Sequence, residues 1–197
     1  TAVGDVANTR AVRKVGDSSI YTSDGASNYL STPDSSDFMF GTGDFTLEMW
    51  VHPTSLPGYQ YLMGQIRTDG TDECFIRIDG TTNKFRLGIQ GDSSGASCIS
   101  TSAIALDTWT HLAAVRDDET LRVYVNGVQE TTTDFGTQSQ TEPTAQYQIC
   151  RVQYSSATGF VGYMDEIRVS NSCRYPDGTT FTPSTTAFTA DANTKLL

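Results

Sequence analysis

The chain has 197 residues, of which 37% are apolar and 18% charged, so it holds enough apolar side chains for one packed domain and too many for a disordered chain. Its formal net charge of −10 makes nucleic acid a poor partner, because an acidic surface repels phosphate backbones. No apolar run is long enough to insert into a membrane. The N-terminus has neither a Met nor a signal-peptide pattern, so we expect a processed product or a piece of a longer protein.

Short alternating runs of apolar and polar residues recur along the chain and are broken by Gly, Asp, Asn, Ser and Pro. They predict strands, in chain order, at residues 18–23, 28–31, 45–52, 61–67, 74–79, 84–90, 98–102, 109–117, 120–127, 128–135, 147–152 and 160–170. Asn126-Gly127 is the favoured pair for a tight type I′ hairpin turn. About a dozen short strands at this spacing indicate an all-β fold, an antiparallel sandwich of two sheets.

The strand expected at residues 45–52 separates its side chains into two rows, since successive residues point to opposite faces. We expect the core row to be Phe45, Leu47, Met49 and Val51. The other row mixes polar groups with a large aromatic, as the outer face of a sheet does: Thr46, Glu48, Trp50 and His52.

A carboxylate interrupts a row that otherwise looks built for a core in the strand at residues 160–170. Strict alternation places Asp165 with Val161, Tyr163, Ile167 and Val169. A buried carboxylate must be hydrogen-bonded or metal-bound, because a lone one is costly to desolvate. We expect Asp165 to accept backbone N–H bonds from a neighbouring loop, with metal coordination as the alternative. Glu166 and Arg168 are expected to be ordinary outer-face charges.

Three motifs carry a resemblance to a known family: GTGDFTLEMWVHP, then WTHLAAVRDDETLRVYVNGV, then GFVGYMDEIRVSNSCRYP followed by FTP. In this order they resemble laminin-G-like members of the concanavalin A-like lectin/glucanase superfamily, over residues 18–197, with residues 1–17 as an N-terminal arm or linker. The resemblance implies a two-sheet jelly roll that binds glycans or surface polymers without catalysis, in an extracellular, cell-surface or virion setting.

Two alternatives to this function stay open. The variety with FTLEMWV and a terminal RY, FTP and TKLL is similar to modules of phage tail and fibre proteins and of large secreted proteins. That similarity allows a structural subunit of a phage fibre, capsid decoration or filament, which contacts neighbouring copies or domains.

The other alternative is a glycoside hydrolase, which needs two carboxylates flanking one bond. Related hydrolases take them from one strand as Glu-x-Asp-x-x-Glu, and this spacing does not occur in the sequence. Glu48 stands alone in its row, and the adjacent Asp165 and Glu166 point to opposite faces. His52 and His111 lie near no nucleophile motif. We therefore expect no enzyme activity.

The resemblance also suggests where ligands bind. Relatives often hold Ca²⁺ at the rim of the sandwich, and Asp24 and Asp165 are the metal candidates, because they lie on the first and last core motifs. Glycan sites usually have an aromatic platform, and Tyr59 and Tyr61 in LPGYQY are candidates, since exposed aromatics are unusual in or beside a loop with Pro and Gly; the alternative is that they cover the sheet edge. Trp50 is a third candidate if its face is concave, and a packing residue otherwise.

Four cysteines complete the set of candidate residues: Cys74, Cys98, Cys150 and Cys173. They allow two disulfides with three possible pairings, or four small buried hydrophobic residues. The sequence has no CxxC motif, which argues against a zinc site.

Overall fold

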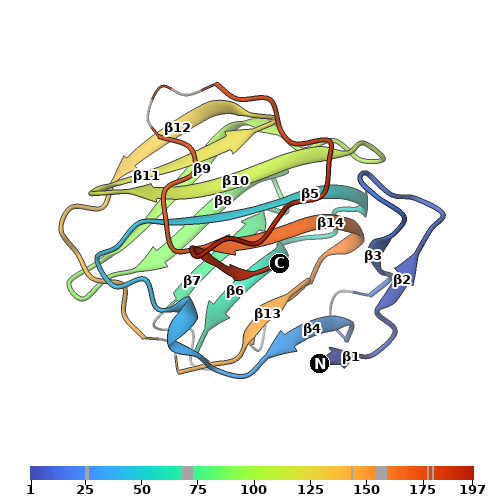
Figure 1. Ribbon diagram of the computed structural model, residues 1–197, viewed down its shortest axis with the longest axis horizontal. Helices are drawn as coiled ribbons and strands as arrows, with labels where there is room; N and C mark the ends of the chain where they lie inside the picture. Colours follow the sequence, from blue (N-terminus) through green and yellow to red (C-terminus); the bar gives the residue numbers. More distant parts are fainter. Residues whose placement is uncertain (25–26, 68–72, 143, 154–158, 177, 179) are drawn as a thin grey trace.

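The computed structural model describes residues 1–24, 27–67, 73–142, 144–153, 159–176, 178 and 180–197. Two antiparallel sheets stack face to face, as the sequence predicts, and the only helix in these ranges is the short 3-10 helix η1 (Ser36–Phe38) (Figure 1). No helix among the described residues is long and apolar enough to cross a membrane.

One sheet has seven strands, in the order β1 (Ala2–Val3), β4 (Tyr29–Thr32), β13 (Tyr147–Ile149), β6 (Gln60–Ile66), β7 (Glu73–Ile78), β8 (Lys84–Gln90) and β9 (Gly95–Ala103). The other has eight, in the order β12 (Val128–Asp134), β11 (Thr120–Val125), β10 (Thr110–Asp117), β5 (Phe45–Ser55), β14 (Val161–Ser170), β3 (Ser19–Thr22) and β2 (Ala7–Thr9), with β15 (Thr194–Leu196) beside β14. Every predicted strand is present. The short strands β1, β2 and β15 escape the sequence analysis, because two or three residues show no alternation.

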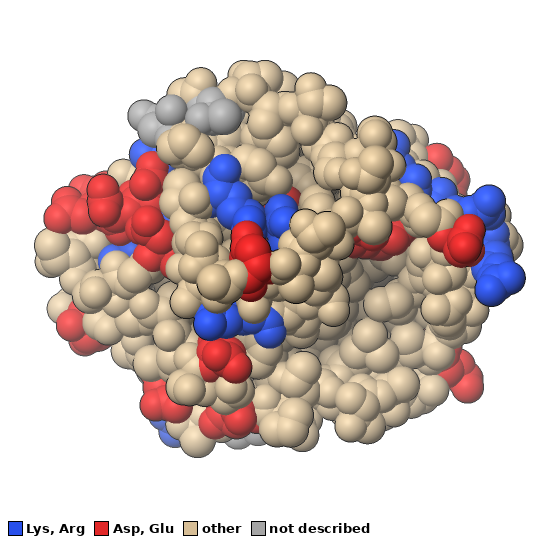
Figure 2. Space-filling view, in the orientation of Figure 1, with Lys and Arg blue, Asp and Glu red and all other residues tan. Residues whose placement is uncertain are grey.

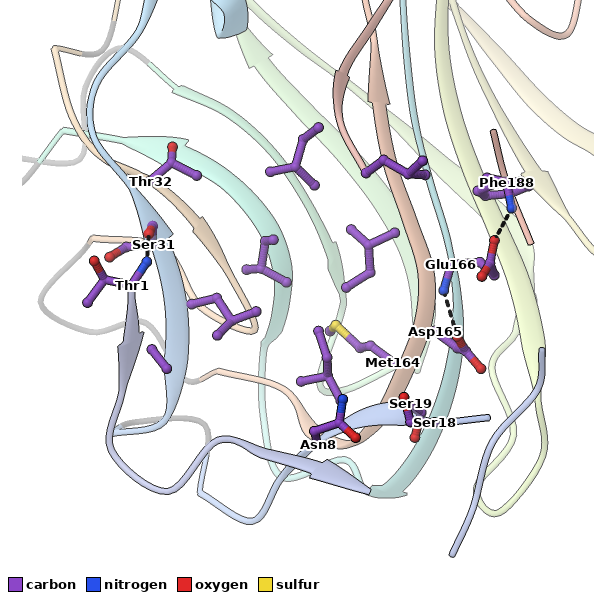
Figure 3. Close-up of a pocket in the computed structure, with 17 residues that line it drawn as sticks. Thr1, Asn8, Ser18, Ser19, Ser31, Thr32, Met164, Asp165, Glu166 and Phe188 are labelled. Carbon is purple, nitrogen blue, oxygen red and sulfur yellow. Dashed lines mark hydrogen bonds between the residues drawn. The ribbon is translucent and has the colours of Figure 1, made fainter. Parts of the chain in front are cut away.

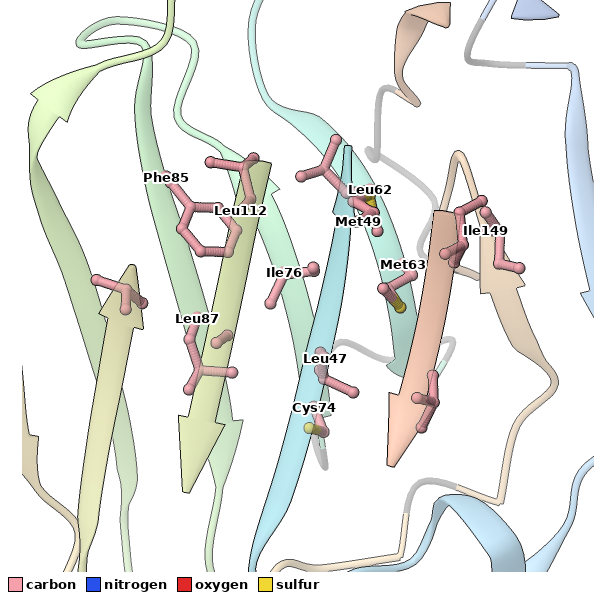
Figure 4. Close-up of a cluster of buried hydrophobic side chains, with 14 of the residues drawn as sticks. Leu47, Met49, Leu62, Met63, Cys74, Ile76, Phe85, Leu87, Leu112 and Ile149 are labelled. Atoms are coloured by element: carbon pink, nitrogen blue, oxygen red, sulfur yellow. The ribbon is translucent and has the colours of Figure 1, made fainter. Parts of the chain in front are cut away.

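The core lies between the two sheets, where the predicted inner row of β5 packs against strands of the seven-stranded sheet (Figure 4). All four side chains of that row are fully buried: Phe45, Leu47, Met49 and Val51. Facing them are Leu62 of β6, Ile76 of β7 and Leu87 of β8, which are also fully buried. Burial of each such side chain stabilises the fold by about 1.5–3 kcal/mol, so this interlocked layer is the main source of stability.

The hairpin between β11 and β12 has the predicted turn. Asn126 and Gly127 both adopt positive φ, 51° and 79°, as a type I′ turn requires. The Gly127 position also lies under the C-terminal part of the chain, since an added Cβ there would fall 1.8 Å from the carbonyl oxygen of Phe181. This position therefore needs glycine for two reasons.

A β-bulge in β14 makes the predicted row of Asp165 wrong. Asp165 pairs with Trp50 of β5, and Arg168 pairs with Glu48. Between these two pairs β14 advances by three residues and β5 by two, so β14 contains one extra residue. Glu166 is the extra residue and has a φ of 49°. Before the bulge the inward residue is Met164, and after it Ile167 and Val169 point inward. Asp165 therefore lies on the outer face of the eight-stranded sheet.

Both ends of the chain dock on the sandwich. In the N-terminal residues 1–17, β1 pairs with β4 of one sheet and β2 with β3 of the other. The segment between β14 and β15 crosses the outer face of the eight-stranded sheet, and we call its described residues, 171–176, 178 and 180–193, the C-terminal strap (Figure 1). Within the strap, Tyr175 and Phe181 stack on each other and pack against Tyr124 of β11.

The four cysteines are free thiols. Cys74, Cys98 and Cys150 are buried, and Cys173 is half-buried. Burial raises the pKa of both the Cys74 and the Cys150 thiol to about 12, so they stay protonated at neutral pH. They act as small hydrophobic side chains, which is one of the two roles that the sequence allows.

Candidate functional site

Tyr59 and Arg77 form the centre of a cluster on the outer face of the seven-stranded sheet. Tyr59 lies just before β6 and is 49% exposed. The Arg77 guanidinium carbon lies 4.0 Å from the centroid of the Tyr59 ring. Arg77 Nε donates to Asp79 Oδ1 at 2.6 Å, and Nη1 donates to the Tyr61 hydroxyl oxygen at 2.9 Å. We call Tyr59, Tyr61, Arg77, Asp79 and Arg86 the Tyr59 cluster.

Strand register explains how these residues meet. Tyr61 of β6 lies opposite Arg77 of β7, and Arg77 lies opposite Arg86 of β8. Directly opposed residues share a face, so three neighbouring strands present these side chains on one side. Tyr59 enters from the preceding loop, and there the chain approaches itself closely, since a Cβ on Gly80 would lie 2.0 Å from the carbonyl carbon of Gly58.

The side chains of the Tyr59 cluster set one another's protonation states through hydrogen bonds and ion pairs. Burial opposes the charge of Arg77, but the hydrogen bond to Asp79 and the Tyr61 hydroxyl outweigh it and raise the pKa of the guanidinium. Burial raises the pKa of Tyr61, so its hydroxyl stays neutral. Arg86 Nη1 lies 3.9 Å from Asp79 Oδ2. The result is a rigid set of hydrogen-bond donors and acceptors beside a half-exposed aromatic ring.

Trp50 lies on the opposite sheet, away from Tyr59 and Tyr61. It is 6% exposed, and its Nε1 donates to the carbonyl oxygen of Ser184 in the strap at 3.3 Å. Lys14 Nζ lies 4.1 Å from the centroid of its ring. Trp50 therefore packs beneath the strap and the N-terminal residues. Trp50 lies on the outer row of β5, as predicted. The sequence of β5 alone does not indicate that other segments cover it.

Asp165 accepts backbone N–H bonds from a neighbouring segment, and this confirms the expected hydrogen bonding. Its Oδ2 accepts from Lys14 and Val15 at 2.8 and 2.9 Å, and its Oδ1 accepts from Glu166 at 2.9 Å. The carboxylate thereby fastens the N-terminal residues to β14.

The two metal candidates, Asp24 and Asp165, lie at opposite ends of the β3–β14 pairing. Asp165 spends both oxygens on N–H donors. Asp24 follows Thr22, which pairs with Gly162, whereas Asp165 lies beyond Met164 at the other end of the β3–β14 pairing. The described residues contain no group of three or more His, Cys, Asp or Glu side chains that could hold a metal ion. Binding of Ca²⁺ through other oxygen ligands stays a prediction.

A buried ionic network lies beneath the strap, and the sequence did not predict it. Glu48 Oε1 accepts from Arg168 Nε at 2.8 Å and from Nη2 at 2.6 Å, and Oε2 accepts from the Tyr175 hydroxyl at 2.6 Å. His111 Nε2 lies 3.3 Å from Oε2. The Phe188 ring covers Arg168, whose guanidinium carbon lies 3.9 Å from the ring centroid.

The network corrects the expectation that Glu166 and Arg168 are ordinary outer-face charges. Arg168 is buried in the network, and a carboxylate oxygen of Glu166 accepts the backbone N–H of Phe188. Burial opposes ionisation of Glu48, but the nearby His111 side chain, the charge of Arg168 and the Tyr175 hydroxyl outweigh it and lower the pKa of the carboxyl. These residues fasten the strap to the sheet.

Comparisons with known proteins agree with this architecture. The family described as the concanavalin A-like lectin/glucanases superfamily matches residues 24–177. No curated protein sequence matches the chain significantly.

Three solved structures illustrate the similarity. Domain 4 of an extracellular arabinanase from Geobacillus stearothermophilus, solved with arabinotriose, has a TM-score of 0.66 and 21% identity over 86% of this chain and 77% of its own. A CBM40 of a Ruminococcus gnavus sialidase, bound to α2,3-sialyllactose, has a TM-score of 0.65 and 13% identity over 79% and 90%. Mouse laminin α1 domains LG4-5 have a TM-score of 0.60 and 14% identity over 84% and 46%. At these identities the similarity is one of fold.

Proposed function

The chain belongs to the concanavalin A-like lectin/glucanase superfamily, and we propose that it is a non-catalytic glycan-binding module. Two of the structures that share its fold contain a bound oligosaccharide, arabinotriose in one and sialyllactose in the other. A fold alone does not fix a ligand, so the proposal depends on a site in this chain.

The Tyr59 cluster is the observation that carries the proposal. A sugar ring presents a C–H face and an edge of hydroxyl groups. The half-exposed Tyr59 ring offers an apolar surface for the C–H face, and it lies beside the guanidinium of Arg77. Asp79 accepts and Arg86 donates hydrogen bonds, which is what sugar hydroxyls require. Tyr61 is a positioning residue, because its hydroxyl holds Arg77 in place.

Two carboxylates weighed in the sequence analysis for hydrolysis, Glu48 and Asp165, are engaged in contacts that hold the fold together. Glu48 is fully buried and paired with Arg168, and Asp165 accepts three N–H bonds. Neither carboxylate is placed to donate a proton to a glycosidic oxygen, and this supports binding without hydrolysis.

A glycan array followed by titration calorimetry tests the proposal, with arabinotriose and 3′-sialyllactose as the first soluble probes. We expect binding to at least one glycan, and we expect Tyr59→Ala to weaken it tenfold or more. Leu106→Ala is the matched control, because Leu106 is 48% exposed and lies outside the Tyr59 cluster. An array without any bound glycan, or equal affinity of Tyr59→Ala and the unchanged protein, would overturn the proposal. Repeating the titration with EDTA tests whether Ca²⁺ assists.

The setting and partners follow from the same proposal. A glycan-binding module acts where glycans are displayed, so we propose an extracellular, cell-surface or virion location. One of the similar structures belongs to an arabinanase described as extracellular, which supports this setting. Neighbouring copies or domains of a larger assembly are the alternative partners, and light scattering of the purified chain would reveal self-association.

A further inference from the structure

A cavity of about 470 Å³ opens between the two sheets at one edge of the sandwich (Figure 3). Its walls come from β3, β14 and β15 on one side and from β4 and β13 on the other. Much of the lining is aliphatic, and these side chains belong to the core or pack against it: Ile20, Leu30, Ile149, Met164, Ile167 and Leu196. In Figure 2 the surface is hollowed beside the C-terminal strand, and mainly uncharged residues surround the hollow. The volume lies in the range of small-molecule sites.

The opposite edge of the sandwich is closed, so the opening at the cavity is a feature of one edge only. There β9 and β12 are joined by side chains: Thr131 Oγ1 donates to Ile99 O at 2.7 Å and Thr133 Oγ1 donates to Ser97 O at 3.1 Å. Glu130 completes this link by accepting the backbone N–H of Ser102 at 3.0 Å. The cavity therefore occurs at one edge of a sandwich whose other edge is sealed by hydrogen bonds.

A gap in the eight-stranded sheet forms the mouth of the cavity. On this side β14 pairs with β3 as far as Met164, and with β15 only from Val169 onward. Residues 165–168 thus have no neighbouring strand on this side within the described part of the chain. The bulge at Glu166 lies in this gap, with its left-handed backbone, and such bulges occur often beside binding sites.

The chemistry of the lining selects among ligands. Hydroxyl and amide groups contribute to it, from Asn8, Ser18, Ser19, Ser31 and Thr32. The lining includes Asp165 and Glu166, whose carboxylates accept backbone N–H bonds, and the Thr1 ammonium, which donates to the carbonyl oxygen of Ser31. No Lys or Arg side chain of the described residues lines the cavity. A carboxylate-bearing ligand would give up its hydration without a Lys or Arg side chain to pair with it, and the Thr1 ammonium is already hydrogen-bonded to Ser31 O. An uncharged hydroxyl would instead meet donors and acceptors.

We propose that this cavity binds a small uncharged molecule with an aliphatic body and a hydroxyl group. The aliphatic walls take the body, and the hydroxyl and amide groups of the lining take the hydroxyl group. The site is separate from the Tyr59 cluster, so either proposal can fail without the other.

Methyl NMR of the intact chain tests this proposal, with octan-1-ol and octanoate as probes of equal chain length. The protein has four methionines, of which Met164 lines the cavity, while Met49 and Met63 are core residues outside the lining. We expect octan-1-ol to shift the Met164 methyl resonance saturably and to leave those of Met49 and Met63 in place, and we expect octanoate to bind at least tenfold more weakly. An unshifted Met164 resonance, or equal affinity for the two probes, would overturn the proposal.

Two variants sharpen the test. Ser18→Trp places a large ring at the mouth and should weaken octan-1-ol binding tenfold or more. Ser23→Trp is the matched control, because Ser23 is exposed and lies outside the lining. Glu166→Lys puts a cation at the mouth and should reverse the preference toward octanoate, and an unchanged preference would count against the proposal. Tyr59→Ala should leave octan-1-ol binding unchanged, since Tyr59 does not line the cavity.

Discussion

The outer faces of the two sheets each carry a guanidinium packed on an aromatic ring, and they differ in what covers the pair. Arg168 lies 3.9 Å from the Phe188 ring centroid under the strap, and Arg77 lies 4.0 Å from that of Tyr59. Phe188 belongs to the covering segment itself, whereas Tyr59 keeps half of its surface exposed. The same contact thus closes one face and stays accessible on the other. Substitutions on the eight-stranded face should therefore change stability, and those on the seven-stranded face should change binding.

Arg168→Leu should produce the largest loss of stability. It leaves the Glu48 carboxylate buried beside His111 and Tyr175 without its cation, and breaking a buried ion pair costs about 3–5 kcal/mol. Urea denaturation measures the loss. The double variant Glu48→Leu with Arg168→Leu removes both charges and should regain more than half of it. A single variant as stable as the unchanged protein would show that the strap does not depend on this pair.

Asp165→Ala should have an intermediate effect, a loss of about 1–3 kcal/mol. Removal of the carboxylate leaves the N–H groups of Lys14 and Val15 without their acceptor. Thermal unfolding measures the loss, and Asp165→Asn should lose less, since an amide oxygen still accepts. An unaltered melting temperature for Asp165→Ala would contradict the role of Asp165 in fastening the N-terminal residues.

Acidification should weaken the strap-covered face through Glu48. The pKa of this carboxyl is lower in the folded chain than in the unfolded chain, so its stabilising contribution is complete above the unfolded pKa and is lost as the pH falls through the folded pKa. Chemical denaturation at a series of pH values below neutral should show stability falling with pH. Glu48→Gln should flatten this dependence, and equal slopes for the two proteins would exclude Glu48 as its source.

Tyr59→Ala should have the smallest effect on stability, within about 0.5 kcal/mol, because the side chain is half exposed and outside the core. Thermal unfolding measures it beside Leu106→Ala, for which we expect a similar result. A loss of several kcal/mol in the free energy of unfolding would mean that Tyr59 covers the sheet edge, which is the alternative role given in the sequence analysis.

The fold was predictable from the sequence because alternation is a local signal. It places Leu47 and Met49 in the core, and Asn126-Gly127 in its turn. The bulge was not predictable, since Glu166 is not a residue that commonly takes positive φ. Because of this one extra residue, Asp165 lies on the outer face of its sheet instead of the inner one. The hydrogen bonds of Asp165 were still predictable, since a buried carboxylate needs donors and backbone N–H groups supply them.

The candidate sites were less predictable, because they depend on contacts between distant segments. Tyr59 and Tyr61 could be noticed in their loop, but their contacts with Arg77 follow from the β6–β7 register. The strap covers Trp50 and Glu48, and this was not predictable because the strap residues show no periodic pattern. The cavity depends on where β3 ends and β15 begins along β14, and neither boundary has a sequence signal.

The position of β5 has a consequence for how the chain is made. This strand is at the centre of its sheet, yet Thr46 pairs with Ser170, and the charge of Glu48 is matched by Arg168. At 5–20 residues per second, a ribosome needs on the order of ten seconds to synthesise the chain between these partners. During that interval the core row of β5 is made but its sheet is incomplete, so the nascent chain needs protection from aggregation until β14 emerges.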